Sequence, residues 1–332
     1  MKGGTRVAEF ISSFTTGFGE MISRALPSLL PGAKILRVYN GLIHYAYPGN
    51  PKNIIHVPFF NNSYYVLRFF QEKNLTFGQM TTEAAQAKLR YPVPEGSFRV
   101  RFSKGNQFAG VDKQVSLRAE NAVIKSSRLM LDRLNPATEL WYVIRDEGFG
   151  FYGQLLQKRA ATEKNLHPGE LRPEFAWLMC RCGQPAQNSV IIDPFAGYGA
   201  IPAQIIRHFQ FARLIANDID PGKLPPMDDP RVQIFHEDAL RLTGIENTSI
   251  DLVITDPPWG YYEQIDDIAL FYESMLREFM RILKPDGRAV VLSARKEEFA
   301  QAIENTGAFA IERTVHTLVN GKKAGVYVLK PI

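Results

Sequence analysis

The second half of the chain alternates short apolar segments with longer amphipathic ones, and this alternation restricts the fold more than any other feature. The apolar segments include SVIID, RLIAND and IDLVITD, and the segments with helical periodicity include IPAQIIRHF and ALFYESMLREFMRIL. A short strand without polar alternation is buried on both faces, and a helical connection places the strands that it joins parallel to each other. The pattern therefore predicts an α/β domain over residues 173–332, with a mostly parallel sheet covered by helices on both sides.

The last segment of the chain departs from this alternation. AIERTVHTLVNGKKAGVYVLKP contains two strand-like runs on either side of Asn320 and Gly321. Asn-Gly between two such runs is a strong signal for a two-residue hairpin. We therefore expect an antiparallel hairpin at one edge of the otherwise parallel sheet.

The first half predicts strands and helices of an α+β type. VAEFISSF and SFRVRFS have strand patterns, and Asn40-Gly41 marks a hairpin between AKILRVY and LIHYAY. Because strand side chains alternate between two faces, Arg99 and Arg101 are expected on the same face.

Residues 115–131 show the core-facing stripe of a helix, formed by Val115, Ala119, Ala122, Val123, Ser126 and Met130. At 3.6 residues per turn Arg118, Lys125 and Arg128 fall within one arc of this helix. Such an arc either binds phosphate groups or is a solvated helix face, and the residues alone leave both interpretations open.

The two halves of the chain carry opposite net charges. Residues 1–165 contain 22 Lys and Arg against 12 Asp and Glu, a net charge of +10, whereas the remainder contains 17 against 22, a net charge of −5. A basic half joined to an acidic half indicates that the first half meets a polyanion. The alternative is that the difference arises by chance or for solubility.

The location of the protein is predicted from what the sequence lacks. No apolar run approaches the roughly 20 residues that span a bilayer, and MKGGTRVAEF has no signal-peptide pattern. The two cysteines, Cys180 and Cys182, are one residue apart and show no ligand spacing with histidines, so we interpret them as structural thiols and expect no metal site. A cytoplasmic protein without a membrane partner is expected.

Acidic residues follow four successive predicted strands of the second half: Asp193, Asp218, Asp238 and Asp256. Taken singly, an acid at a strand end is often a helix cap or a loop residue. In an open parallel sheet, however, ligands bind beyond the carboxyl ends of the strands. Four acids there predict a shared anionic lining, suited to a ligand with a ribose, an amine and a positive charge. S-adenosyl-L-methionine has all three.

The loop after the first of these strands is DPFAGYG, whose glycines allow a ligand to approach the backbone closely. A nicotinamide dinucleotide site requires glycine at position 202, where this chain has Pro202. Asp193 before the loop also repels a pyrophosphate but suits a cation.

The stretch TDPPWG, residues 255–260, follows the fourth strand. An exocyclic amine on a base is a poor nucleophile unless its lone pair is oriented, and the carboxylate of Asp256 and the carbonyl of Pro257 are placed to accept its hydrogens. Trp259 can stack on a base that has left its helix. The alternative is a stiff turn followed by a core tryptophan.

DPFAGYGAIPAQI, ANDID, HEDAL and TDPPWG resemble, in order and spacing, the motifs of class I methyltransferases that modify exocyclic amines of adenine or guanine. FRVRFSKGNQF and LNPATELWYVIRDEGFGFYGQLLQKR resemble a THUMP domain. The resemblance implies a ferredoxin-like domain over residues 1–70, a THUMP RNA-binding domain over 71–160, a linker over 161–172 and a Rossmann-like methyltransferase domain over 173–332.

The same resemblance implies transfer of a methyl group from S-adenosyl-L-methionine to N2 of a guanosine in tRNA, at position 6 or 10, with the THUMP half holding the 3′ end. We expect a monomer, and a partner subunit is the alternative. It assigns catalysis to Asp256, Pro257 and Trp259. The cofactor-binding residues are His167, Pro168, Leu171, Arg172, Asp193, Pro194, Ala196, Gly197, Gly199, Asp218, Ile219, Asp238, Ala239 and Asp256. Candidate RNA contacts are Arg99, Arg101, Lys113, Arg118, Lys125 and Arg128.

Two other functions remain open at this point. Adenine N6-methyltransferases of RNA or DNA also use the tetrapeptide DPPW, so the target base is inferred from the THUMP-like half. An RNA-binding protein with an inactive methyltransferase domain is the third possibility, against which the full set of strand-end acids argues.

Overall fold

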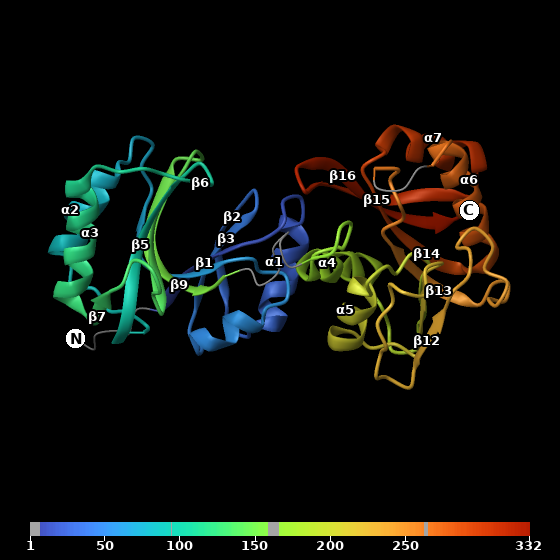
Figure 1. Cartoon of the computed structure of the whole chain (residues 1–332), viewed down its shortest axis with the longest axis horizontal. Helices are drawn as coiled ribbons and strands as arrows, with labels where there is room; N and C mark the ends of the chain where they lie inside the picture. Colours follow the sequence, from blue (N-terminus) through green and yellow to red (C-terminus); the bar gives the residue numbers. More distant parts are fainter. Residues whose placement is uncertain (1–6, 94, 159–165, 262–264) are drawn as a thin grey trace. The chain divides into compact units, whose positions relative to one another are not determined.

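The computed structural model describes residues 7–93, 95–158, 166–261 and 265–332. The chain divides into two compact units, the first formed by Met1–Phe14 with Gly19–Arg159 and the second by Thr15–Phe18 with Ala160–Ile332 (Figure 1). Part of the predicted linker, residues 161–165, lies outside the described residues. None of the helices in the described part of the chain has both the length and the apolar character needed to cross a membrane.

One sheet of nine strands runs through the first unit, in the order β2-β3-β1-β4-β9-β8-β5-β6, with β7 paired to β5. Because β4 pairs with β9, the sheet is continuous across both predicted N-terminal domains, and their division at residue 70 stays a prediction. The strands are β1 (Ala8–Ser13), β2 (Lys34–Tyr39), β3 (Leu42–Tyr47), β4 (Ser63–Phe70), β5 (Glu95–Lys104), β6 (Gln107–Phe108), β7 (Arg128–Leu131), β8 (Thr138–Arg145) and β9 (Phe149–Gln157).

Helices α1 (Gly19–Leu29), α2 (Phe77–Gln86) and α3 (Lys113–Ser126) and the 3₁₀ helix η1 (Pro51–His56) complete the first unit. In Figure 1, α2 and α3 lie side by side against one face of the sheet. Their contact residues Met80, Ala84, Ala119 and Ala122 pack on large side chains of the strands, such as Tyr142. The small residues let the two helices approach the sheet closely.

The helix predicted over residues 115–131 is shorter than expected. It ends at Ser126, and residues 128–131 form β7, parallel to β5. The Ser127 hydroxyl donates to the carbonyl of Val123 at 2.8 Å, a local hydrogen bond that competes with continuation of a helix. Met130, which the helical stripe placed in the core, is 71% exposed, and Arg128 is not on the helix at all.

The second unit contains a seven-stranded sheet in the order β12-β11-β10-β13-β14-β16-β15. Its first five strands are parallel, and β16 is antiparallel to both of its neighbours, as predicted. The elements are α4 (Pro173–Gly183), β10 (Val190–Asp193), α5 (Ala200–His208), β11 (Arg213–Asn217), β12 (Val232–Phe235), β13 (Ile250–Thr255), α6 (Ile268–Ile282), β14 (Leu283–Ser293), α7 (Lys296–Thr306), β15 (Phe309–Val319) and β16 (Lys322–Pro331).

Helices cover both faces of this sheet. α6 and α7 lie side by side (Figure 1) and pack with Phe279 and Phe299 on the face that carries Val253. On the opposite face Gly183 of α4 lies so close to Leu252 that an added Cβ would be 2.9 Å from its Cδ1. The strands are therefore buried on both sides, as their apolar sequences predicted.

The strand order reverses between β10 and β13. β11 and β12 lie on one side of β10, while β13 and β14 lie on the other, so the connections leave the sheet in opposite directions. Such a switch point leaves a crevice at the carboxyl ends of the central strands. The sheet thereby brings the ends of β10, β11 and β13 to one place.

Candidate active site

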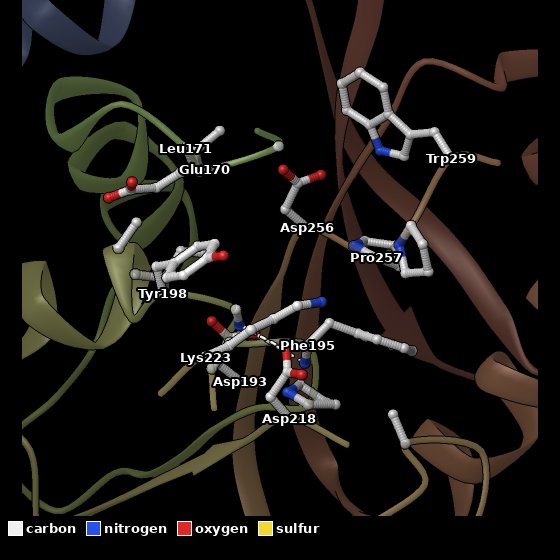
Figure 2. A pocket seen from close by; sticks show the side chains of 18 of the residues that line it. Glu170, Leu171, Asp193, Phe195, Tyr198, Asp218, Lys223, Asp256, Pro257 and Trp259 are labelled. Carbon is white, nitrogen blue, oxygen red and sulfur yellow. Dashed lines mark hydrogen bonds between the residues drawn. The ribbon is translucent and has the colours of Figure 1, made fainter. Parts of the chain in front are cut away.

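A pocket of about 440 Å³ opens in the second unit, at the ends of β10, β11 and β13 (Figure 2). This volume lies within the range of ordinary ligand pockets, roughly 300–1,000 Å³. Most of the predicted catalytic and cofactor residues line it: Pro168, Leu171, Asp193, Pro194, Ala196, Gly197, Asp218, Ile219, Asp238, Ala239, Asp256, Pro257 and Trp259. The predicted residues His167, Arg172 and Gly199 do not line it and instead support residues that do.

Asp193 ends β10 and is buried at the base of the pocket (Figure 2). Its Oδ1 accepts hydrogen bonds from the Thr255 hydroxyl at 2.7 Å and from the Phe195 amide at 3.3 Å. Burial raises the pKa of Asp193 to about 7, against the lowering effect of these hydrogen bonds. The carboxyl group therefore changes its charge near neutral pH.

The loop after β10 depends on two glycines with positive φ, Gly197 at 52° and Gly199 at 80°. A Cβ on Gly199 would lie 2.9 Å from Cε of Met227, so this glycine allows close packing of the neighbouring loop. At Gly197 a Cβ would meet nothing within 4 Å and would project into open space beside the pocket. Gly199 is thus structural, whereas Gly197 keeps the backbone accessible to a ligand.

Asp218 follows β11 and connects two loops. Its Oδ2 accepts from the amide of Gly197 at 2.8 Å, and its Oδ1 accepts from the amide of Asp220 at 3.0 Å. Only 8% of the residue is exposed. Because each carboxylate oxygen has more than one acceptor position, the side chain keeps acceptor capacity for a ligand hydroxyl.

The neighbouring Asn217 holds three strand ends together. Its side-chain amide donates to the carbonyls of Pro194 at 2.9 Å and Glu237 at 3.0 Å, and its Oδ1 accepts from the Glu237 amide at 2.9 Å. The side chain is completely buried. We predicted no role for Asn217 from the sequence, although a fully satisfied buried amide helps to fix the loops.

Asp256 lies on the pocket wall directly after β13 (Figure 2). Its Oδ1 is buried and has no hydrogen-bond partner among the residues that the structure describes. Burial raises the pKa of Asp256 well above its usual value, and the nearby Asp193 carboxyl adds to the shift. A buried oxygen without a partner is costly, which is typical of a group that binds a substrate or takes up a proton.

The side chain of Trp259 is anchored rather than buried in the core. Its indole Nε1 donates to the carbonyl of Leu292 at 3.3 Å, and its own carbonyl accepts from Nε of Arg295 at 3.0 Å. The residue is partly exposed and lines the pocket. The interpretation of Trp259 as a core residue is therefore wrong, and its indole is held at the end of β14.

The segment Pro168–Leu171 forms another wall and is held at both ends. The imidazole of His167 stacks on the ring of Tyr198, with centroids 3.9 Å apart and an angle of 12° between the planes. Nη2 of Arg172 donates to Oδ1 of Asn320 at 3.1 Å. His167 and Arg172 thus position the segment instead of lining the pocket.

Several lining residues were not predicted, and they include Phe195, Tyr198, Lys223, Tyr261, Phe271, Asn320 and Lys322. Lys223 belongs to the proline-rich segment between β11 and β12, in which no helix is described. Leu224 of this segment packs with Met227 on Ala196 and Ala216. A coil therefore covers this side of the pocket, and no periodic pattern in the sequence indicated it.

The six predicted RNA contacts lie in the first unit, on more than one surface. Arg99 pairs with Glu139 on the sheet face opposite α3, whereas Arg118 donates to the Thr82 hydroxyl at 2.8 Å beside α2. Arg101 lies over the ring of Phe108, and Arg128 pairs with Glu95 at 3.3 Å. The expected single arc of Arg118, Lys125 and Arg128 is therefore wrong, because Arg128 is on β7.

The acids of the pocket form no metal site in the described part of the chain, where no group of three or more His, Cys, Asp or Glu side chains has a suitable arrangement. Both cysteines are buried, and burial raises the pKa of Cys182 to about 11. The site offers carboxylates, backbone amides and an apolar wall. Such a set suits an organic ligand that carries hydroxyl groups and positive charge.

A methyltransferase family model and several curated methyltransferases are similar to this chain. A family model described as RMKL-like methyltransferase domain matches residues 229–324. The tRNA (guanine(6)-N(2))-methyltransferase THUMP3 of Bos taurus is 30% identical over 208 residues, which are 52% of this chain and 40% of that protein. This chain thus spans less than half the length of that relative.

Two matches from Thermus thermophilus cover more of the chain. A tRNA (guanine(6)-N2)-methyltransferase is 24% identical over 258 residues, 73% of this chain and 75% of that protein. The crystal structure of TrmN superimposes with a TM-score of 0.79 at 18% identity, over 98% of this chain and 100% of that one. The fold predicted from the sequence, a Rossmann-like methyltransferase domain with a mostly parallel sheet, is confirmed.

Proposed function

We propose that this chain is an S-adenosyl-L-methionine-dependent methyltransferase that modifies the exocyclic N2 amine of a guanosine in tRNA, at position 6 or 10. The observation that carries the proposal is a buried carboxylate oxygen of Asp256 that has no hydrogen-bond partner among the described residues, on the wall of a pocket with other strand-end acids. The printed names of two relatives support tRNA and guanine N2 as the substrate.

The cofactor fits the residues that line the pocket. Asp218 would accept the ribose hydroxyls, and Asp238 would contact the adenine. Pro194, Ala196 and Gly197 would line the methionine portion, where the open space beside Gly197 leaves room. The segment Pro168–Leu171 would close over it. When bound, this cofactor supplies an activated methyl group on a sulfonium.

The residues after β13 would orient the target amine. Asp256 and the carbonyl of Pro257 accept its two hydrogens, which directs the nitrogen lone pair away from the base. Trp259, held by the carbonyl of Leu292, gives the base a fixed surface for stacking. Asp256 then takes the proton that the amine loses, and its raised pKa makes this carboxylate a stronger proton acceptor than an exposed one.

The basic first unit would hold the RNA. We propose that it contains a THUMP domain that grips the 3′ end of tRNA, and that the protein acts as a cytoplasmic monomer. Lys113 and Lys125, near the two ends of α3, and Arg101 on β5 are the proposed contacts. The net charge of +10 over residues 1–165 supports a polyanionic partner.

The affinity for S-adenosyl-L-methionine is expected to rise with pH through about 7. Asp193, whose pKa is raised to about 7, holds its proton in the free protein at acidic pH, and a bound cation favours its loss. The affinity for the cofactor then rises by up to about tenfold per pH unit for each proton released. Calorimetry in buffers of different ionisation enthalpy measures the release, and a dissociation constant independent of pH would contradict it.

The raised pKa of Asp193 also predicts how the stability of the cofactor-free protein depends on pH. Asp193 binds its proton more tightly in the folded than in the unfolded chain, so its contribution to stability is lost as the pH rises through about 7. Asp193→Asn should remove this dependence from the thermal midpoint measured without cofactor. If the thermal midpoint of the variant depends on pH as that of the natural protein does, another group is responsible.

Transfer of labelled methyl groups to unmodified tRNA tests the proposed function. We expect incorporation from S-adenosyl-L-methionine, and nucleoside analysis should identify N2-methylguanosine. N6-methyladenosine would indicate the alternative specificity. Absence of transfer to a complete set of tRNAs, with cofactor binding intact, would refute the proposal, and absence of cofactor binding would favour an RNA-binding protein.

A further inference from the structure

A cluster of two cations and one aromatic ring lies at the pocket, beyond Trp259, in the second unit. The ring is that of Tyr261, with Nζ of Lys322 at 3.0 Å from its centroid and Cζ of Arg295 at 4.9 Å. We call these three residues the rim cluster. Tyr261 and Lys322 line the pocket, and Tyr261 is 45% exposed.

The rim cluster is held in place by the fold. Arg295 donates through Nε to the Trp259 carbonyl at 3.0 Å, and its amide donates to the Ser293 hydroxyl at 3.0 Å. Lys322 begins β16 directly after the Asn320-Gly321 turn. Asn320 in turn accepts from Arg172 at 3.1 Å. Lys322 is thus positioned by a pinned hairpin turn rather than by a free loop.

The charge of the rim cluster is balanced only in part. Arg295 contacts Glu298 at 3.4 Å, but no carboxylate in the described ranges forms an ion pair with Lys322. The base of the same pocket is acidic, with Asp193, Asp218 and Asp256. A ligand that carries an anionic group and an amine therefore has a defined orientation, with the anion at the rim and the amine toward Asp256.

We propose that the rim cluster binds the backbone phosphate of the nucleotide whose base enters the pocket. This inference rests on the proposed function, because it requires a nucleic-acid substrate. A base that is methylated must leave its stack, and the phosphate next to it then needs a fixed contact. Lys322 supplies the charge, Arg295 supplies guanidinium donors, and both cations pack on the ring of Tyr261.

Replacing Lys322 with alanine tests the rim cluster. We expect KM for tRNA to rise about tenfold, and the slope of log KM against log salt concentration to fall by about one, as for loss of one phosphate contact. The dissociation constant of the cofactor should not change, because the cofactor portion of the pocket lies at the strand-end acids. Lys322→Arg should restore most of the affinity for tRNA.

Lys323→Ala is the matched control. Lys323 is the next residue of β16, is exposed and does not line the pocket. If Lys322→Ala and Lys323→Ala change KM and the salt slope equally, Lys322 contributes only general surface charge and the proposal is wrong.

A binding experiment separates this proposal from the proposed function. The dissociation constant of a fluorescent single-stranded RNA oligonucleotide is measured for the unmodified protein and for both variants. Weaker binding by Lys322→Ala alone supports the rim cluster even if no methyl transfer to tRNA is found. Equal dissociation constants for the unmodified protein and both variants would overturn the rim-cluster proposal, whatever the result of the transfer assay.

Discussion

Asp256→Ala is expected to lower the rate of methyl transfer by about a thousandfold or more, with little change in cofactor affinity. The carboxylate has two roles in the proposed reaction, orienting the amine and accepting its proton. Removal of one preorganised hydrogen-bonding group costs roughly 10²–10³ in rate, and a positioned base contributes roughly 10²–10⁴. Single-turnover transfer to tRNA and calorimetry with S-adenosyl-L-methionine measure the two quantities.

The control is Asp266→Ala, because Asp266 is an exposed acid of the segment between β13 and α6 that does not line the pocket. It should leave the rate unchanged. A near-normal rate in Asp256→Ala would refute the orienting role. Asp256→Asn keeps the shape and one acceptor but loses the base, so its rate should fall between those of the natural protein and the alanine variant.

The stability of the Asp256 variants distinguishes a functional residue from a structural one. In the part of the chain that the structure describes Oδ1 has no partner, and burial without one costs the folded state roughly 1–3 kcal/mol. Asp256→Asn should therefore leave the thermal midpoint of the free protein unchanged or raise it. A clear fall would indicate that the carboxylate holds the loop together.

Asp218→Ala is expected to weaken cofactor binding by about a hundredfold or more. In the proposed site the carboxylate accepts both ribose hydroxyls, and a hydrogen bond to a charged group contributes roughly 1.5–3 kcal/mol. The substitution also removes the contact with the Gly197 amide, so the loop after β10 loses part of its support. Calorimetry with S-adenosylhomocysteine measures the loss without turnover.

Asp220→Ala is the control for this experiment. Asp220 is exposed, accepts from the Gly222 amide at 2.9 Å and does not line the pocket. Its removal should change the dissociation constant by less than about twofold. If Asp218→Ala binds the cofactor as tightly as Asp220→Ala does, the ribose assignment is wrong.

The sequence predicted the acidic side of the pocket because that side follows from the sheet alone. Asp193 ends its strand, and Asp218 and Asp256 directly follow theirs. The apolar composition of these strands forces them into the centre of a parallel sheet. Once the strands are parallel, their carboxyl ends must meet at one edge. No knowledge of loop conformation is needed to bring these side chains together.

Residues that reach the pocket from distant parts of the chain could not be predicted in this way. The Asn320-Gly321 turn was recognised as a hairpin, but nothing in its local pattern indicates that Asn320 contacts Arg172 or that Lys322 contacts Tyr261. These contacts depend on the length and twist of β15 and β16, which are tertiary properties.

The helix prediction was wrong at residues 128–131 for a similar reason. Arg128–Leu131 continues the apolar period of α3, but its backbone pairs with β5, and this pairing outweighs helix propensity. Partners of the cations are equally nonlocal, since Arg99 meets Glu139 only because β5 and β8 are neighbours. Charge patterns therefore overestimated the number of cations available to RNA.

The hydrogen bonds of Asn217 have a consequence for the thermodynamics of cofactor binding. One buried amide joins the ends of β10 and β11 and the residues after β12 before any ligand is present. Ligands that order loops lose affinity to the entropy of that ordering. Here these strand ends are already ordered, so little of the cofactor's binding free energy is lost to ordering them.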